Sequence, residues 1–85
     1  MSNKNEVLFE INELIYKITR IDLIKQDKMQ VNFFELELNL KPYQVAMILF
    51  SCSTLFGVDL YNKVHLDDLS LHKICSIIVS FVNET

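Results

Sequence analysis

The stretch PYQVAMILFSCSTLFG, residues 42–57, defines the clearest helix of the chain. Proline is well tolerated at the first position of a helix, and glycine is favoured just past the last turn. Pro42 stands at the first of these positions, and Gly57, the only glycine of the chain, stands at the second. The apolar residues that share one face between them are Val45, Ala46, Leu49, Cys52 and Phe56. We therefore expect a helix that begins at Pro42 and buries this face.

A helix is also predicted earlier in the chain, from about Asn5 to Arg20. Its apolar residues follow the helical repeat: Val7, Leu8, Ile11, Leu14, Ile15 and Ile18. Polar residues are expected to fill much of the other side: Glu6, Glu10, Asn12, Glu13 and Lys17. Asn3 and Glu6 stand three residues apart and fit a variant of the capping box, in which side chains satisfy free groups of the first turn.

Two helices are predicted after Gly57, one short and one long. The short helix is expected around Tyr61–Leu66, and the long helix from about Leu71 to Val82, with Ser70 or Asp68 as its N-cap. The inner stripe of the long helix comprises Leu71, Ile74, Cys75, Ile78 and Val82. We therefore expect a single all-α domain over residues 1–85, a four-helix bundle with three main helices, one short helix and a long first loop.

The segment between the first two helices, residues 21–40, allows two structures in its second half. Lys25 to Lys28 are typical of an exposed loop. Glu35 to Leu40 alternate polar and apolar side chains, which is the period of a half-buried strand. A lone strand has no evident partner in this chain, however. An extended loop that inserts Phe34 and Leu38 into the helical core fits the same residues.

Composition and charge narrow the classes of function. The 85 residues suffice for one domain, and a hydrophobic content of 51% supports a core. The net charge of −3 is spread without a basic cluster, which argues against nucleic acid as a partner because phosphate-rich ligands need concentrated Lys and Arg. Residues 42–58 carry no charged side chain, but they are too few to span a membrane.

The start of the chain and its cysteines bear on the compartment. The first six residues lack the apolar run of a signal peptide, and two cysteines are too few for a secreted disulfide framework. We therefore expect a cytoplasmic protein.

The helix order with a long first loop resembles the acyl carrier and peptidyl carrier protein family over residues 6–82. In that family a loop phenylalanine and a leucine precede an Asp-Ser-Leu motif that opens the second helix, and the serine carries 4′-phosphopantetheine. Phe34 and Leu38 stand at the loop positions, and residues 38–43, LNLKPY, replace the family's Leu-Gly-x-Asp-Ser-Leu without a gap. Downstream, LFGVDL at residues 55–60 is similar to the end of the family's second helix, and LSLHKI at residues 69–74 resembles the entry to its last helix.

The sequence departs from the family at the residue that carries its chemistry. Pro42 occupies the place of the serine and has no hydroxyl group, and Lys41 replaces the neighbouring aspartate. Attachment needs an oxygen at the mouth of the second helix, where free N–H groups and the helix dipole favour a phosphate. We therefore expect no phosphopantetheine and no other cofactor. Three serines elsewhere offer a hydroxyl, but we interpret Ser51 and Ser53 as helix-face residues and Ser70 as a cap.

The second helix offers a different kind of contact. Carrier proteins present this helix to enzymes through acidic side chains, and here it has none. Tyr43, Met47 and Phe50 share the face away from the core, and clusters of aromatic and Met residues are enriched at interfaces. A long loop folded over these residues would instead make them part of the core. Ile77 and Phe81 form a second stripe on the last helix, which favours a homodimer or an obligate partner.

Sites for metals or for catalysis have little support. Cys52 and Cys75 project toward a shared core, so we expect buried, reduced thiols. His65 and His72, with Cys75 three residues later, are an incomplete metal-ligand set and fit surface histidines better. The chain offers no specific nucleophile–base or acid–base pair, and we expect neither an enzyme nor a metal site.

The sequence supports three hypotheses about function. The chain resembles the serine-less acyl carrier-related proteins of bacterial peptide maturation systems, which implies a docking or scaffold role beside enzymes that modify a ribosomal peptide. Tyr43, Met47 and Phe50 are then the expected contact residues, and Lys41 and Pro42 mark the lost attachment site. The second hypothesis is an active acyl or peptidyl carrier with an unorthodox attachment residue. The third is a small regulatory binding protein unrelated to carriers, such as an anti-factor or immunity protein.

Overall fold

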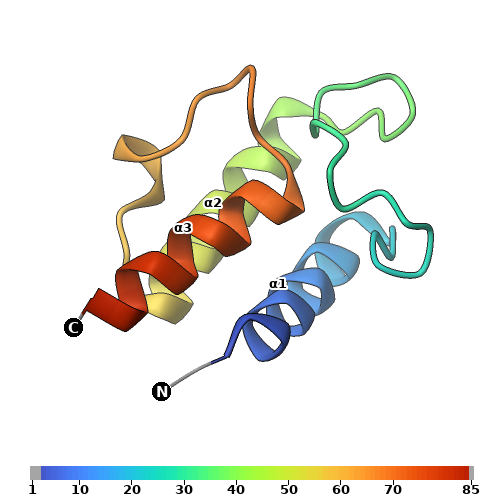
Figure 1. Ribbon diagram of the computed structural model, residues 1–85. Helices are drawn as coiled ribbons and strands as arrows, with labels where there is room; N and C mark the ends of the chain where they lie inside the picture. The colour runs from blue at the N-terminus through green and yellow to red at the C-terminus, as the bar shows by residue number, and fades with distance from the viewer. Residues whose placement is uncertain (1–2, 85) are drawn as a thin grey trace.

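The computed structural model describes residues 3–84 and contains three α-helices and one turn of 3₁₀ helix (Figure 1). The helices are α1 (Lys4–Thr19), α2 (Pro42–Phe56) and α3 (Leu71–Glu84), and the 3₁₀ turn is η1 (Leu60–Asn62). No β-strand occurs in this part of the chain, so the all-α prediction is confirmed. α1 packs against both other helices and runs antiparallel to them, so the start of α1 and the end of α3 lie at the same end of the bundle (Figure 1).

Within residues 3–84, no helix combines the length and the apolar character that crossing a membrane requires.

Local signals determine where the helices begin and end. Asn3 Oδ1 accepts the Glu6 N–H at 2.9 Å and its amide donates to the Glu6 carboxylate at 3.2 Å, so the predicted pairing is confirmed. Gly57 follows α2 with a φ of +68°, a left-handed conformation that glycine adopts without steric cost. Ser70 Oγ accepts the Lys73 N–H at 3.2 Å, which makes Ser70 the cap of α3.

The connection from α2 to α3 contains less helix than expected. The short helix predicted around Tyr61–Leu66 is only the turn η1, which ends at Asn62. Leu60 and Leu69 are fully buried near the two ends of this connection. Two apolar anchors therefore hold the segment against the bundle, although most of it is irregular.

Each long helix buries one stripe of side chains. The buried residues are Val7, Ile11 and Ile15 on α1, Val45, Ile48, Leu49 and Cys52 on α2, and Leu71, Ile74, Cys75 and Ile78 on α3. Ala46 is exposed, contrary to the prediction, and Ile48 is buried instead. Successive helical residues are rotated by about 100°, so the arc centred on Val45, Leu49 and Cys52 includes Ile48 and leaves Ala46 toward solvent.

The long loop, residues 20–41, closes the end of the bundle where α1 ends and where α2 and α3 begin (Figure 1). Its buried side chains are Leu23, Phe33, Leu38 and Leu40. Two backbone hydrogen bonds of 2.8 Å join it to the start of α3, from the Phe33 N–H to the Leu69 carbonyl and from the His72 N–H to the Met29 carbonyl. The loop is therefore ordered by anchors from distant parts of the chain.

Phe33, and not Phe34, is the phenylalanine that enters the core. Phe33 is fully buried, whereas Phe34 is 41% exposed. The Asn32 side chain accepts the Phe34 N–H at 2.9 Å, and this Asx turn bends the chain where the two rings diverge. The prediction for Phe34 is wrong, and the prediction for Leu38, which is 5% exposed, is confirmed.

Residues 35–40 form turns and not a strand. The N–H groups of Leu38 and Asn39 both donate to the Glu35 carbonyl, at 3.1 and 2.9 Å, and Asn39 has a left-handed φ of +50°. Of the three alternating leucines, Leu38 and Leu40 enter the core, while Leu36 points to solvent. Without a neighbouring strand, turns satisfy part of the backbone hydrogen bonding.

A buried asparagine holds the start of the long loop against α1. Asn12 is 8% exposed, contrary to the expectation that it lies on the polar side of its helix. Its amide donates to Asp22 Oδ1 at 2.9 Å, and its carbonyl oxygen accepts the N–H groups of Leu23 and Ile24 at 3.0 and 3.2 Å. Hydrogen bonds from the Lys25 N–H and from Asn12 lower the pKa of the Asp22 carboxyl. The Asn12 amide tolerates burial because the loop forms hydrogen bonds with both its NH₂ group and its carbonyl oxygen.

Replacement of Phe33 by alanine should release the anchor of the long loop. The loss of a buried phenylalanine side chain costs about 3–5 kcal/mol, because it removes apolar contacts and leaves a cavity. We expect the free energy of unfolding, measured by urea denaturation, to fall by about that amount for Phe33→Ala. Phe34→Ala is the matched control and should lower it by less than about 1 kcal/mol. Equal effects of the two substitutions would contradict the placement of Phe33.

Candidate functional site

The first position of α2 is a proline, which has neither a hydroxyl group nor a backbone N–H. Lys41 is the N-cap, and its side chain has no acceptor atom with which to cap the helix. Gln44 Oε1 accepts the Lys41 N–H at 2.9 Å, while the Lys41 carbonyl accepts the N–H groups of Gln44 and Val45. Pro42 occupies the first helical position, as predicted. This end of the helix is therefore closed by a proline and a glutamine.

The outer face of α2 carries an exposed apolar cluster. Tyr43, Met47 and Phe50 lie on successive turns and are 61%, 48% and 66% exposed. The long loop lies at the end of the bundle and leaves these side chains open to solvent. No residue of α2 is charged. We call Tyr43, Met47 and Phe50 the α2 apolar face.

Tyr61 extends this face on the side of η1. Its hydroxyl donates to the Ala46 carbonyl on α2 at 3.0 Å, and its side chain is still 54% exposed. The Leu60 N–H donates to Ser53 Oγ at 3.3 Å, which joins η1 to the same helix. Sequence reasoning did not identify Tyr61, because its place depends on the path of the connection after α2 and no local motif marks it.

A groove of about 510 Å³ lies on the other flank of α2, against α1. It is lined by Glu10, Glu13, Leu14, Lys17, Ile18, Ser51 and Leu55. Met47, Ser51 and Leu55 follow one another at intervals of four residues, so the α2 apolar face continues toward this groove. The Lys17–Glu13 pair at 3.8 Å is exposed and contributes little to stability. The groove therefore adds apolar surface with a charged rim.

The serines considered as substitute attachment points have different environments. Ser51 lines the groove between α1 and α2. Ser53 Oγ accepts the Leu60 N–H, and Ser70 Oγ accepts the Lys73 N–H. The hydroxyls of Ser53 and Ser70 thus accept hydrogen bonds within the fold. The interpretation of Ser70 as a cap is confirmed.

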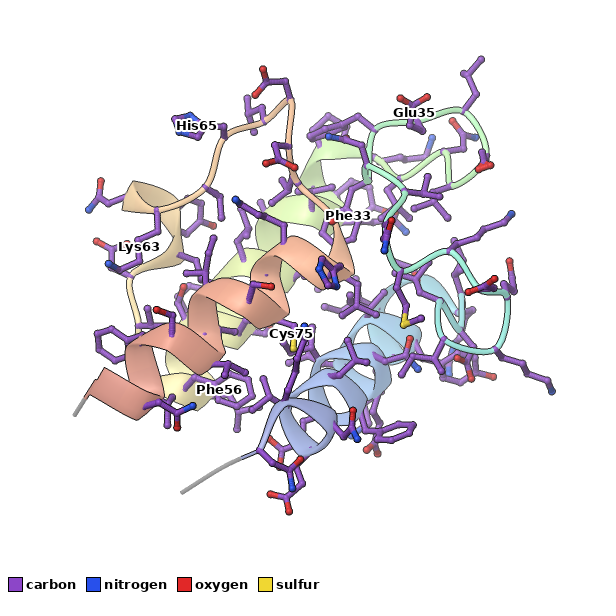
Figure 2. The ribbon with its side chains drawn as sticks, viewed as in Figure 1. Phe33, Glu35, Phe56, Lys63, His65 and Cys75 are labelled. Carbon is purple, nitrogen blue, oxygen red and sulfur yellow. The ribbon has the colours of Figure 1, made fainter. Side chains whose placement is uncertain are left out.

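The two thiols are free and buried, as expected. Burial raises the pKa of Cys52 to about 12. Burial also raises the pKa of Cys75, an effect that the charge of Lys4 partly offsets, and its Sγ lies 3.6 Å from the Lys4 carbonyl oxygen. Figure 2 shows Cys75 between α3 and α1. Both sulfurs therefore belong to the core.

The histidines differ from the thiols in burial. His65 and His72 are exposed, as predicted, and His65 lies on the outer connection after η1 (Figure 2). Among residues 3–83, no cluster of three or more His, Cys, Asp and Glu side chains is arranged to hold a metal ion.

Comparison of the chain with protein-family models, with curated proteins and with solved structures finds no match.

Neither thiol should react with iodoacetamide while the protein is folded. With a pKa of about 12, roughly one Cys52 thiol in ten thousand is a thiolate at pH 8, and the side chain is shielded from the reagent. Intact mass spectrometry should find unmodified protein under native conditions. After unfolding in guanidinium, both cysteines should be alkylated. Rapid alkylation of the native protein would contradict the buried placement.

Proposed function

We propose that this chain is an acyl carrier protein-like module that lacks the phosphopantetheine serine and acts as a protein docking or scaffold component. The α2 apolar face carries the proposal, because two aromatic rings and a methionine are exposed on a helix with no charge. Exposed apolar clusters of this kind mark surfaces that other proteins cover.

Several features support the carrier-like part of the proposal. A long loop separates α1 from α2, and η1 stands between α2 and α3, which is the order expected from the resemblance. Pro42 begins α2 at the position where a carrier has its serine. The Lys41, Pro42 and Tyr43 side chains contain no aliphatic hydroxyl, so the start of α2 offers no ordinary attachment point.

The partner we propose is a biosynthetic or peptide-modifying enzyme of a bacterial peptide maturation or natural-product system in the cytoplasm. In this role the chain has no catalytic residue, cofactor or metal of its own. Burial of a large apolar side chain contributes about 1.5–3 kcal/mol before the costs of association. The α2 apolar face and Tyr61 together offer four such side chains to a partner.

Negative charge placed on the α2 apolar face should prevent the partner from binding. A Tyr43→Asp and Phe50→Asp double variant should lose the enzyme that the wild type retains in a pull-down from native cells, since each carboxylate would be desolvated at the interface. Retained proteins are compared by quantitative mass spectrometry. A loss of at least about tenfold is expected, from the cost of burying unpaired charge.

A matched control tests whether the effect belongs to this face. Phe9→Asp with Tyr16→Asp adds the same charge at two exposed aromatic residues of α1, which are 60% and 44% exposed. This control should keep the partner, and circular dichroism should show that both double variants are folded. A folded Tyr43 and Phe50 variant that keeps every partner would overturn the proposal. Retention of a second copy of this chain alone would instead indicate a homodimer.

An active carrier with an unorthodox attachment residue is the competing function, and Ser51 favours it because its side chain lines a groove. Incubation with a phosphopantetheinyl transferase and coenzyme A distinguishes the two functions. We expect no gain in intact mass, because Ser51 lies on the flank of α2 and not at its start. A gain of one phosphopantetheine that disappears in Ser51→Ala would support the carrier.

A further inference from the structure

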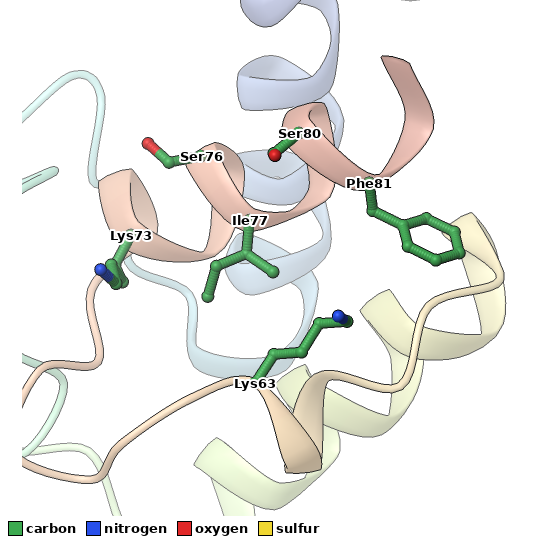
Figure 3. Close-up of a pocket in the computed structure, with 6 residues that line it drawn as sticks. All are labelled: Lys63, Lys73, Ser76, Ile77, Ser80 and Phe81. Atoms are coloured by element: carbon green, nitrogen blue, oxygen red, sulfur yellow. The ribbon is translucent and has the colours of Figure 1, made fainter. Parts of the chain in front are cut away.

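A second groove, of about 450 Å³, lies between α3 and the segment after η1 (Figure 3). It is lined by Lys63, Lys73, Ser76, Ile77, Ser80 and Phe81. None of these residues is part of the α2 apolar face, and Tyr61 is not among them. Ile77 and Phe81, which the sequence presents as a second apolar stripe, are half-buried and form the apolar part of this groove.

The groove gathers the positive charge of the second half of the chain. Lys63 and Lys73 are the only Lys or Arg residues after Lys41, and both line it. No lining residue is acidic, although the whole chain has a net charge of −3. Two lysine side chains in one groove of an otherwise acidic protein favour an anionic ligand.

Neither lysine is neutralised strongly. Lys73 Nζ lies 3.6 Å from Asp68 Oδ2, but the two side chains are 45% and 64% exposed, so the pair is weak. Lys63 Nζ lies 5.9 Å from the centroid of the Phe81 ring, a cation–π contact that orients the ammonium and leaves its charge in place. Among residues 3–83, Lys63 has no carboxylate partner within ion-pair distance.

The spacing of the two charges indicates the shape of the ligand. Figure 3 shows Lys73 at one end of the groove, the Lys63 side chain directed toward Phe81 at the other end, and Ile77 between them. Lys73 and Phe81 are eight residues apart on α3, which corresponds to about 12 Å along a helix. In an extended peptide the first, third and fifth side chains point to the same side and span about 13 Å, which matches that length.

We propose that this groove binds an acidic peptide segment of the docking partner, in extended form, with a carboxylate near each lysine and an apolar side chain over Ile77. The proposal rests on the docking role and adds a second, electrostatic contact to it. A free dicarboxylate shares the same charges, but it lacks the apolar part that the floor of the groove accommodates.

The test is a titration of ¹⁵N-labelled full-length protein with the peptide acetyl-ESLSE-amide, followed by NMR. In an extended chain its two Glu side chains and its Leu side chain point to the same side. Saturable amide shifts are expected along residues 73–81 and around Lys63, with affinity in the millimolar range that is lost at about 1 M salt, where the screening length is about 3 Å. The neutral peptide acetyl-QSLSQ-amide should cause no saturable shifts. Saturable shifts with acetyl-QSLSQ-amide, or none with acetyl-ESLSE-amide, would overturn the proposal.

Two charge-matched variants locate the site. Lys63→Gln with Lys73→Gln should weaken binding of the acidic peptide at least tenfold. Lys25→Gln with Lys28→Gln removes the same charge from the long loop and should leave binding unchanged. Unaltered binding to the first variant, or equal weakening of both, would overturn the proposal, and so would identical shifts with glutarate alone, which would indicate a small-anion site.

The α2 variant separates this proposal from the docking role of α2. Folded Tyr43→Asp and Phe50→Asp protein should bind acetyl-ESLSE-amide as the wild type does, because these side chains do not line the groove. Loss of peptide binding in this variant would overturn the groove as the site, whereas a failed pull-down experiment would leave the titration result intact.

Discussion

The burial of Phe33 at the open end of the helices is the contact on which the rest of this structure depends. Three helices of 14 to 16 residues leave an apolar opening where α1 ends and where α2 and α3 begin. The long loop fills this opening with Phe33, which also donates its N–H to the Leu69 carbonyl beside the start of α3. A domain of 85 residues buries a modest fraction of its surface, so the largest side chain that the loop buries matters to the whole core.

The position of the loop explains why the outer face of α2 is free. The loop is held by the Asn12 side chain at its start and by Leu38 and Leu40 near its end. These anchors keep it at the end of the bundle (Figure 1), and Tyr43 and Phe50 remain exposed. α2 is apolar on both faces, but the rest of the chain covers only its inner face. The outer face is available to a partner protein.

The connection after α2 links the α2 apolar face to the groove beside α3. Leu60 and Leu69 anchor it in the core, and the residues between them are exposed except for the half-buried Val64. Tyr61 reaches back to α2 through its hydroxyl, while Lys63 turns toward Phe81 on α3. One irregular segment therefore places an aromatic side chain beside a neutral face and a cation beside a second groove. A partner that covers both surfaces would combine apolar burial with charge pairing, which contribute affinity and orientation respectively.

The sequence by itself determined the features that depend on neighbours within one or two turns. Asn3, Pro42, Gly57 and Ser70 set helix ends because capping and backbone preferences act locally. The 3.6-residue repeat likewise identified the buried stripe of α3 and the outward position of the α2 apolar face.

Only the tertiary structure decided which side chains enter the core from irregular segments. The choice of Phe33 over Phe34 and the burial of Asn12 involve contacts between residues far apart in the chain, such as Phe33 with Leu69 and Asn12 with Leu23. The same holds for Tyr61, whose hydrogen-bond partner is fifteen residues away. Such contacts depend on where the loops cross the helices, and no pattern within a single segment contains that information.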